Sequence, residues 1–190
     1  FRKSKKTFTA YGIVLLLTFL FNQSFITNLL GRIDFTEDKR YTLSDTTKSI
    51  LKDTENVMYI TIFLDGDLPS GFQRLRQSAI DMARDMSRIS NGNIKVNIIN
   101  PKDGSAHEQQ ELAAALIDRG LQPTNLSVKN SSGISQNLIF PYAIVNKGEE
   151  EINVHLLQNK IGLSPEQVLN NSIQNLEYSF ISAIKKLSIT

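Results

Sequence analysis

The chain has 190 residues, 41% of them hydrophobic, and a formal net charge of +2 at pH 7. It contains no cysteine, which excludes a disulfide framework, a thiol nucleophile, a CxxC redox pair and thiolate metal sites. Four of its 21 basic residues lie among the first six positions, so the rest of the chain, with 19 acidic residues, is slightly acidic. Such a mixed-sign domain offers no basic footprint, and we expect no nucleic-acid partner.

A long uncharged segment follows the basic amino terminus. Residues 7–31 carry no charge, and Arg2, Lys3, Lys5 and Lys6 precede them. About 20 uncharged residues cross the roughly 30 Å hydrocarbon core, and Lys and Arg beside a span tend to remain in the cytoplasm. The sequence therefore predicts a membrane protein with one amino-terminal span and a main domain on the far side of the membrane from the cytoplasm. Four parts are expected: a cytoplasmic basic tail (1–6), a transmembrane anchor (7–31), a juxtamembrane segment with a short helix (32–56) and an α/β domain (57–190).

Two other interpretations of the uncharged segment stay open. The strongly apolar run Ala10–Phe21 has the length of a signal-peptide core, although no A-x-A-like cleavage site follows it. A buried helix of a soluble domain is the second alternative. Because the chain begins with Phe rather than Met, we expect a fragment or a processed product.

Cap residues and hydrophobic periodicity predict the elements that follow. Ser44 is suited to cap a helix that ends near Asp53, and the uncharged run Val57–Leu64 indicates a buried strand. Further elements are expected in this order: a helix capped by Ser70 and ended by Asn91-Gly92, a strand over Ile94–Ile99, a helix from the Ser105–Glu108 capping box to Gly120, strands over Asn125–Lys129, Ile134–Asn146 (interrupted by Pro141) and Glu151–Leu157, and one helix from the Ser164–Gln167 capping box to Leu187.

The order β-α-β-α-β-β-β-α from Val57 predicts an α/β fold class, a three-layer domain with helices on both faces of a mixed sheet. The stretch Phe140–Gly148, which begins with a proline and closes in a glycine hairpin, resembles the thioredoxin-like fold. In that fold the proline is cis and lies beside the redox pair. The matching loop Asp65–Gly71 has no cysteine, so the domain is expected to be thioredoxin-like without the redox motif. A Rossmann-like or flavodoxin-like arrangement is the alternative.

Residues suited to catalysis or metal binding are few. His107 and His155 have no second ligand at metal-binding spacing, and no phosphate-binding glycine motif occurs. The carboxylates of Glu149–Glu151 crowd a predicted hairpin tip, while turn formation and helix capping explain Asp65 and Asp67. We therefore assign no catalytic, cofactor-binding or metal-binding residue, and we expect neither a cofactor nor an enzyme activity.

Cations on the second predicted helix indicate a surface for interaction or for solubility. Arg74, Arg76, Arg84 and Arg88 lie on one side of that helix. Solubilising charge is the favoured interpretation. A docking face is the alternative, with Arg74 and Arg84 as its candidate interaction residues.

Three features together resemble one known family. They are the single anchor near the start, the segment Arg32–Ser44 and the late helix Leu176–Leu187. Over essentially its whole length the chain is similar to the amino-terminal part of the GldG family, the gliding-motility-associated ABC transporter auxiliary components of Bacteroidetes. The run from Asp34 to Ser44 is the most specific part, since generic α/β folds do not demand it.

The resemblance implies a non-catalytic, membrane-anchored periplasmic accessory subunit of an ABC transporter complex involved in gliding motility. The anchor would lie in the inner membrane, and the α/β domain (57–190) would be periplasmic. Its partners would be a GldF-like permease subunit and a GldA-like ATPase subunit. The cationic and aromatic juxtamembrane residues can lie at headgroup level and orient the domain, and we expect this segment to transmit conformational change. Its candidate coupling residues are Asp34, Thr36, Asp38, Lys39, Arg40 and Tyr41. Two other functions stay open, a periplasmic solute- or peptide-binding domain and a thioredoxin-like enzyme, which the absence of cysteine disfavours.

Overall fold

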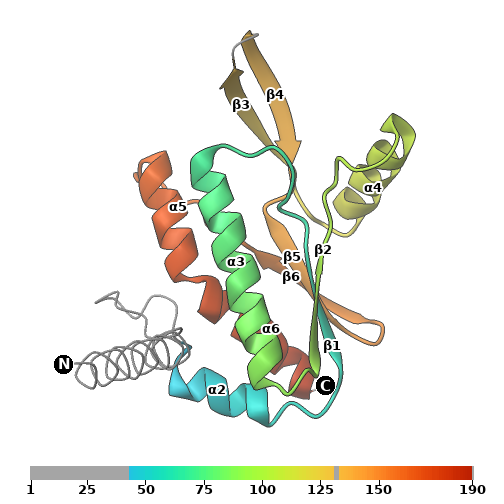
Figure 1. Cartoon of the computed structure of the whole chain (residues 1–190), viewed down its shortest axis with the longest axis vertical. Helices are drawn as coiled ribbons and strands as arrows, with labels where there is room; N and C mark the ends of the chain where they lie inside the picture. The colour runs from blue at the N-terminus through green and yellow to red at the C-terminus, as the bar shows by residue number, and fades with distance from the viewer. Residues whose placement is uncertain (1–42, 131–132, 190) are drawn as a thin grey trace, which may run out of the picture. The chain divides into compact units, whose positions relative to one another are not determined.

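A four-stranded sheet with the strand order β2-β1-β5-β6 lies at the centre of the structure. The computed structural model describes residues 43–130 and 133–189 (Figure 1). A second sheet is formed by β3 and β4, which project at the top of Figure 1. The elements are α2 (Asp45–Lys52), β1 (Met58–Ile62), α3 (Ser70–Ile89), β2 (Ile94–Ile98), α4 (Ala106–Asp118), β3 (Thr124–Asn130), β4 (Gly133–Ile139), β5 (Tyr142–Lys147), β6 (Glu150–His155), α5 (Pro165–Gln174) and α6 (Leu176–Ile189).

The strand pairing makes the central sheet mixed. β1 runs parallel to β2, and α3 connects the two as the predicted crossover helix. β5 is antiparallel to both of its neighbours, β1 and β6. The predicted mixed α/β class is therefore confirmed. The Rossmann-like or flavodoxin-like alternative requires a mostly parallel sheet, which these strands do not form.

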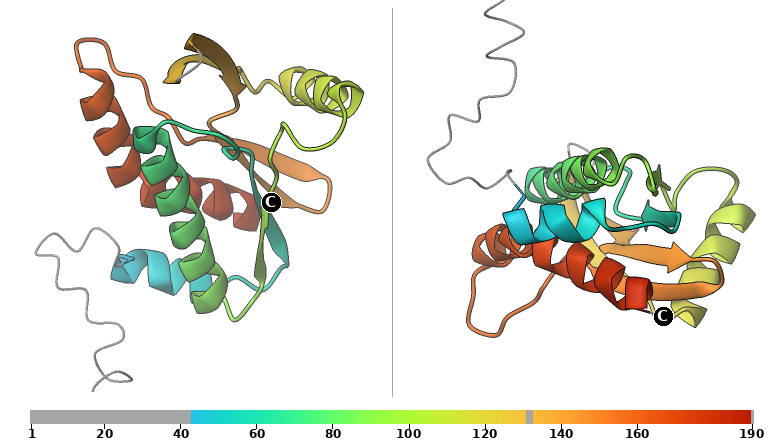
Figure 2. Two further views of the ribbon diagram at one scale, coloured as in Figure 1. Left: turned by 45° about the horizontal axis from the view of Figure 1, so that its top comes forward. Right: turned by 90° about the horizontal axis from the view of Figure 1, so that it is seen from below.

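One face of the sheet, called here the closed face, carries the main core. Helices α3 and α6 pack on it, and α2 and α5 pack against these two helices (Figures 1 and 2). Strand β1 turns Ile60 and Ile62 into this core, where Leu75 of α3 and Phe180 of α6 are also fully buried. Burying each such side chain contributes roughly 1.5–3 kcal/mol, so this face supplies most of the hydrophobic stabilisation.

The opposite face, called here the open face, is covered only in part. Ile144 of β5 points away from the main core and belongs, with Leu116 of α4, to a second and smaller buried cluster. Farther along this face Tyr59 is 42% exposed, and its neighbour Lys95 on β2 is exposed as well. Helix α4 thus covers one part of the open face and leaves the rest to solvent.

Most predicted helix starts are confirmed by their capping bonds. Ser44 caps α2, and the boxes Ser105–Glu108 and Ser164–Gln167 begin α4 and α5. Ser70 does not cap α3. It is the first residue of the helix itself, after Pro69, and no side chain caps this end.

The predicted strand Ile134–Asn146 is divided between two sheets. β4 pairs with β3, whereas β5 pairs with β1 and β6. Pro141 lies between them and lacks a backbone N–H, so pairing cannot continue through it. No peptide bond among the described residues is cis, and the Phe140–Pro141 bond is therefore trans, unlike the proline that the fold resemblance implies.

The predicted last helix is interrupted at Asn175, so α5 and α6 run in different directions (Figure 1). The Asn175 side-chain amide donates to the Asn171 carbonyl at 2.7 Å, and its backbone N–H donates to the same carbonyl at 3.1 Å. A side chain that bonds its own preceding turn competes with regular helix geometry, which explains the break.

The predicted basic tail and anchor, residues 1–6 and 7–31, lie outside the described residues. Among the helices within 43–130 and 133–189, none is long and apolar enough to span a membrane. Helix α2 belongs to the compact unit that begins at Leu43, and it buries Leu51 completely.

Candidate functional site

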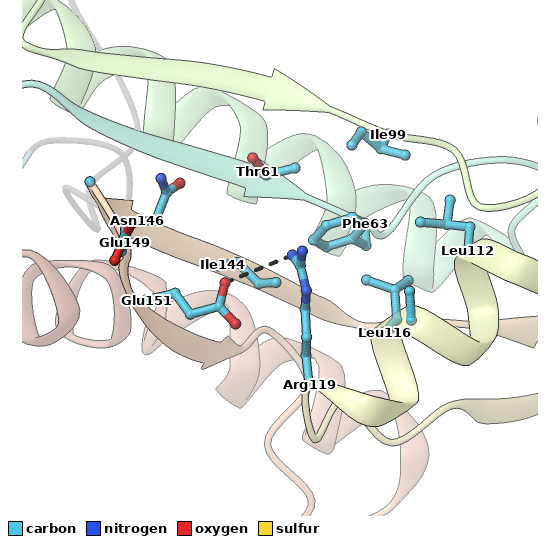
Figure 3. A pocket seen from close by; sticks show the side chains of 12 residues that line it. Thr61, Phe63, Ile99, Leu112, Leu116, Arg119, Ile144, Asn146, Glu149 and Glu151 are labelled. Carbon is cyan, nitrogen blue, oxygen red and sulfur yellow. Dashed lines mark ion pairs between the residues drawn. The ribbon is translucent and has the colours of Figure 1, made fainter.

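A cavity of about 480 Å³ lies between α4 and the open face (Figure 3). Its walls come from β1, β5, the β5–β6 hairpin, α4 and the residue after β2. Apolar side chains form the part near α4, and polar ones lie toward the hairpin (Figure 3). The lining residues are Thr61, Phe63, Ile99, Leu112, Ala115, Leu116, Arg119, Ile144, Asn146, Gly148, Glu149 and Glu151.

Three charged side chains line this cavity, two of them paired. Arg119 Nη1 lies 3.7 Å from Glu151 Oε2, with the side chains 52% and 39% exposed (Figure 3). A pair as exposed as this contributes at most about 1 kcal/mol. Glu149 has no ion-pair partner in the part of the chain that the structure describes. The cavity therefore holds one negative charge in excess.

The backbone around Arg119 is held by β6. Arg119 is the C-cap residue of α4, and Gly120 follows with φ +84°, a left-handed conformation that suits glycine at a helix end. Asn153 Nδ2 donates to the Arg119 carbonyl at 2.7 Å. This bond fixes the carboxyl end of α4 to the sheet edge and thereby places the guanidinium beside the hairpin.

Polar side chains connect the loops that follow the parallel strands. Asp65 Oδ1 lies 2.7 Å from Arg76 Nε, and both side chains are about one-third exposed or less. Lys102 Nζ donates to Asn137 Oδ1 at 2.9 Å, and Asn137 Nδ2 donates to the Asp67 carbonyl at 3.3 Å. Active sites of α/β folds often lie at this end of the strands. Here the side chains bond one another, so they support the loops.

A third polar group joins α6 to the start of α2. The Ser44 backbone N–H donates to Glu177 Oε1 at 2.9 Å. Partial burial raises the pKa of the Glu177 carboxyl, but hydrogen bonds from Thr47 and Ser44 and the charge of Lys48 outweigh it, and the pKa is lowered from its ordinary 4.5. We call this contact, between Glu177 and Ser44 with Thr47, the α2–α6 clamp.

Three of the four arginines in the predicted surface on α3 already lie beside acidic residues. Arg76 is engaged with Asp65, Arg88 Nη2 lies 2.8 Å from Asp85, and Arg74 Nη2 lies 3.9 Å from Glu166. Arg84 is exposed on α3 and makes no ion pair with any described residue. Arg74 and Arg84 thus remain on the surface as candidate interaction residues. The six candidate coupling residues, Asp34, Thr36, Asp38, Lys39, Arg40 and Tyr41, lie outside the described residues.

The two histidines are separated in the structure. His107 faces Glu111 on the exposed side of α4, with 3.2 Å between Nε2 and Oε1. The ring of His155 lies 4.7 Å from that of Tyr142, centre to centre. Within 43–130 and 133–189 no three His, Asp or Glu side chains lie close enough to hold a metal ion.

Sequence analysis missed Arg119 and Glu177 as site residues. In the sequence, Arg119 is recognisable only as a basic residue at the end of a predicted helix. The partner of Glu177 lies 133 residues away in the sequence, so no local pattern could identify it.

Comparison with known proteins gave one match. Residues 37–146 match a family described as a domain of unknown function (DUF7088). The match begins within the segment Arg32–Ser44, passes through α2 and ends in β5. No curated protein and no solved structure matched the chain.

Proposed function

The chain belongs to the DUF7088 family, and we propose that it is a non-catalytic, membrane-anchored accessory subunit of an ABC transporter complex involved in gliding motility. Residues 7–31 would anchor it in the inner membrane, with the α/β domain in the periplasm. A GldF-like permease subunit and a GldA-like ATPase subunit would be its partners. This proposal extends the resemblance of the sequence to the GldG family.

The α2–α6 clamp is the observation that carries this proposal. A subunit that transmits movement from its anchor needs a stiff connection where the juxtamembrane segment enters the domain. Ser44 lies within that juxtamembrane part, directly before α2, and its backbone N–H donates to Glu177 on α6, the helix that packs across the closed face. Leu43 beside it is buried in the main core. Movement of residues 32–42 would therefore act on the core directly.

Replacement of Asp38–Tyr41 by Gly-Ser-Gly-Ser in the full protein tests the coupling role. We expect the variant to fold and to reach the membrane but to lose gliding motility, because a flexible linker does not transmit force. The matched control replaces Asn159–Gly162, an exposed loop of equal length between β6 and α5, and should keep motility. Motility that survives the first replacement would refute the coupling role.

Association with partners is tested separately by purification from membranes. We expect a permease and an ATPase to copurify with the full-length protein. If neither is recovered under conditions that preserve other transporter complexes, the subunit assignment is wrong.

We also propose that the domain is thioredoxin-like without the redox motif. The strand order β2-β1-β5-β6, the parallel crossover through α3, and the packing of α3 and α6 on one face with α4 on the other support this. The loop Asp65–Gly71 has no cysteine, so an insulin-reduction assay is expected to show no activity. Reduction of insulin would favour the enzyme alternative.

A second candidate function, binding of a solute or peptide, is favoured by the cavity beside α4. Its volume of about 480 Å³ is typical of ligand sites, and both apolar and polar side chains line it. A ligand that binds only the folded state raises the melting temperature, so thermal-shift screening against periplasmic small molecules tests this function.

A further inference from the structure

We propose that the outer edge of strand β2 binds an extended acidic segment of a partner protein, which adds to the central sheet as a further strand. In the segment that fits this edge, apolar residues alternate with acidic ones. The inference is independent of the transporter role proposed above, because it uses neither the α2–α6 clamp nor the anchor.

One side of β2 has no partner strand. β2 lies at the end of the order β2-β1-β5-β6, so it pairs with β1 alone. The Ile99 N–H donates to the Ile62 carbonyl at 2.9 Å, so the backbone groups of Ile99 face β1. In a parallel pair, the backbone groups of alternate residues face the partner strand, and those of Val96 and Ile98 therefore point outward. No described residue bonds to them.

Strand β2 lacks most of the features that keep natural edge strands from pairing. Such edges carry proline, a β-bulge or several charges. The sequence of β2, IKVNI, contains one charge and no proline, and its pairing with β1 is unbroken over Ile94–Ile98. The Ile94 N–H already donates to the buried Ser90 Oγ at 3.0 Å. The part of the edge that is free for pairing is therefore centred on Val96 and Ile98.

The closed-face side chains of this edge favour apolar residues on the added strand. Val96 and Ile98 lie beside Ile60 and Ile62 of β1 and pack against the main core, but both are only half-buried. Residues that lie opposite one another on neighbouring strands have side chains on the same face. An added strand with apolar residues at alternate positions would cover Val96 and Ile98 and gain free energy from their burial.

The open-face side chains of this edge favour an acidic segment. Lys95 and Asn97 are exposed there, and Lys95 makes no ion pair with any described residue. Their neighbours on β1, Tyr59 and Thr61, are uncharged. A glutamate opposite Lys95 on the added strand would have its Cβ about 5 Å away, where opposite charges stabilise a strand pair. A second β2 would bring another lysine and no carboxylate, so a second copy of the chain fits this edge less well.

The other edge of the sheet does not fit the same partner. Strand β6 begins with Glu150 and Glu151, and both are exposed. Like charges that lie opposite one another on neighbouring strands are destabilising. An acidic segment would therefore pair with β2 and be repelled by β6.

Two peptides of equal length and opposite charge test this surface. They are Thr-Val-Glu-Val-Glu-Val-Thr and Thr-Val-Lys-Val-Lys-Val-Thr, each with blocked ends and a fluorophore. Binding to the full chain in phosphatidylcholine nanodiscs is followed by fluorescence anisotropy, and hydrogen exchange of the Val96 and Ile98 amides reports whether the edge is occupied. Lys95→Glu reverses the charge of the edge. Lys160→Glu is the matched control, since Lys160 is an exposed lysine in the loop after β6.

We expect the acidic peptide to bind, to slow exchange at Val96 and Ile98, and to bind about tenfold more tightly than the basic peptide. Lys95→Glu should reverse this preference, whereas Lys160→Glu should keep it. Two N-methylated forms of the acidic peptide, one methylated at the valines and one at the glutamates, test the backbone pairing. In either strand direction only one of these two sets of N–H groups faces β2, so one form should lose binding and the other should keep it.

Four results would overturn the proposal. Absence of binding up to millimolar peptide, equal affinities of the two N-methylated forms, or binding without slower exchange at Val96 and Ile98 would exclude strand addition at this edge. Equal affinities of the acidic and basic peptides would exclude an acidic partner. Sedimentation of the full chain in detergent tests the other occupant: we expect a monomer, and a dimer that the acidic peptide dissociates would assign the edge to a second copy.

Discussion

The closed and open faces of the central sheet differ in how completely helices cover them. On the closed face α3 and α6 bury a continuous core, and α2 and α5 pack against both helices. On the open face α4 contributes to a small cluster and leaves a cavity beside it. Stability is therefore concentrated on one face, while the other retains space and polar groups. Substitutions on the two faces should have effects that differ in size and in kind.

The largest effect is expected on the closed face. Phe180→Ala removes a fully buried aromatic side chain from the main core and should lower the free energy of unfolding by about 3–5 kcal/mol. Urea denaturation measures the change. Tyr178→Ala, at a position 72% exposed on the same helix, is the control and should change stability by less than about 0.5 kcal/mol.

A smaller effect is expected where α4 packs on the open face. Leu116→Ala should cost about 2 kcal/mol, the lower end of the range for leucine, because the second cluster is small. Amide hydrogen exchange in α4 should accelerate more than exchange in α3. Ile117→Ala, next to it and 48% exposed, should leave both quantities nearly unchanged. An equal acceleration in α3 would contradict the difference between the two faces.

The α2–α6 clamp should give a pH-dependent effect on the closed face. Because the folded-state pKa of Glu177 is lowered from 4.5, its ionised form stabilises the fold above that pH, and this contribution disappears as the pH falls through the folded-state value. Glu177→Gln should therefore cost about 1 kcal/mol at neutral pH. Its difference from the unmodified chain should shrink in acid. A difference that is independent of pH would exclude the carboxylate as its cause.

The smallest effect is expected at the ion pair of the cavity. Glu151→Gln should change the free energy of unfolding by less than about 0.5 kcal/mol, since both partners are exposed and 3.7 Å apart. Thermal denaturation at low and high salt measures this. A large loss of stability would mean that the ion pair contributes substantially to the stability of the open face.

Local signals in the sequence predicted most elements of the fold. The capping boxes at Ser105 and Ser164 and the uncharged strand over Val57–Leu64 describe interactions within a few residues, and the structure contains all three elements. The strand was expected to be buried on both faces, but it is buried on one face only, since Tyr59 is 42% exposed on the open face. The predicted strand Ile134–Asn146 is divided at Pro141 because its two halves pair with different strands. No local sequence pattern identifies those partner strands. The break at Asn175 arises from one side-chain amide.

The candidate site was less predictable for the same reason. Arg119, Glu149 and Glu151 meet only because the β5–β6 hairpin folds toward the end of α4. On α3, by contrast, helical spacing places Arg74, Arg84 and Arg88 on one side, whereas Arg76, two residues after Arg74, lies on the other side. Three of the four arginines have an acidic neighbour within 4 Å. Spacing along one element predicts a shared face, but it does not predict what lies opposite that face.

The ribbon formed by β3 and β4 has a consequence for engineering the chain. It pairs with itself alone, and the residues that flank it, Leu121 and Phe140, are buried in the same small cluster. The chain therefore enters and leaves the ribbon at the same place. The part of the ribbon beyond Leu126 and Asn137 can therefore be shortened, exchanged or fitted with a label while the order of strands in the central sheet is preserved, whereas Ile139, which is buried in the main core, has to be kept.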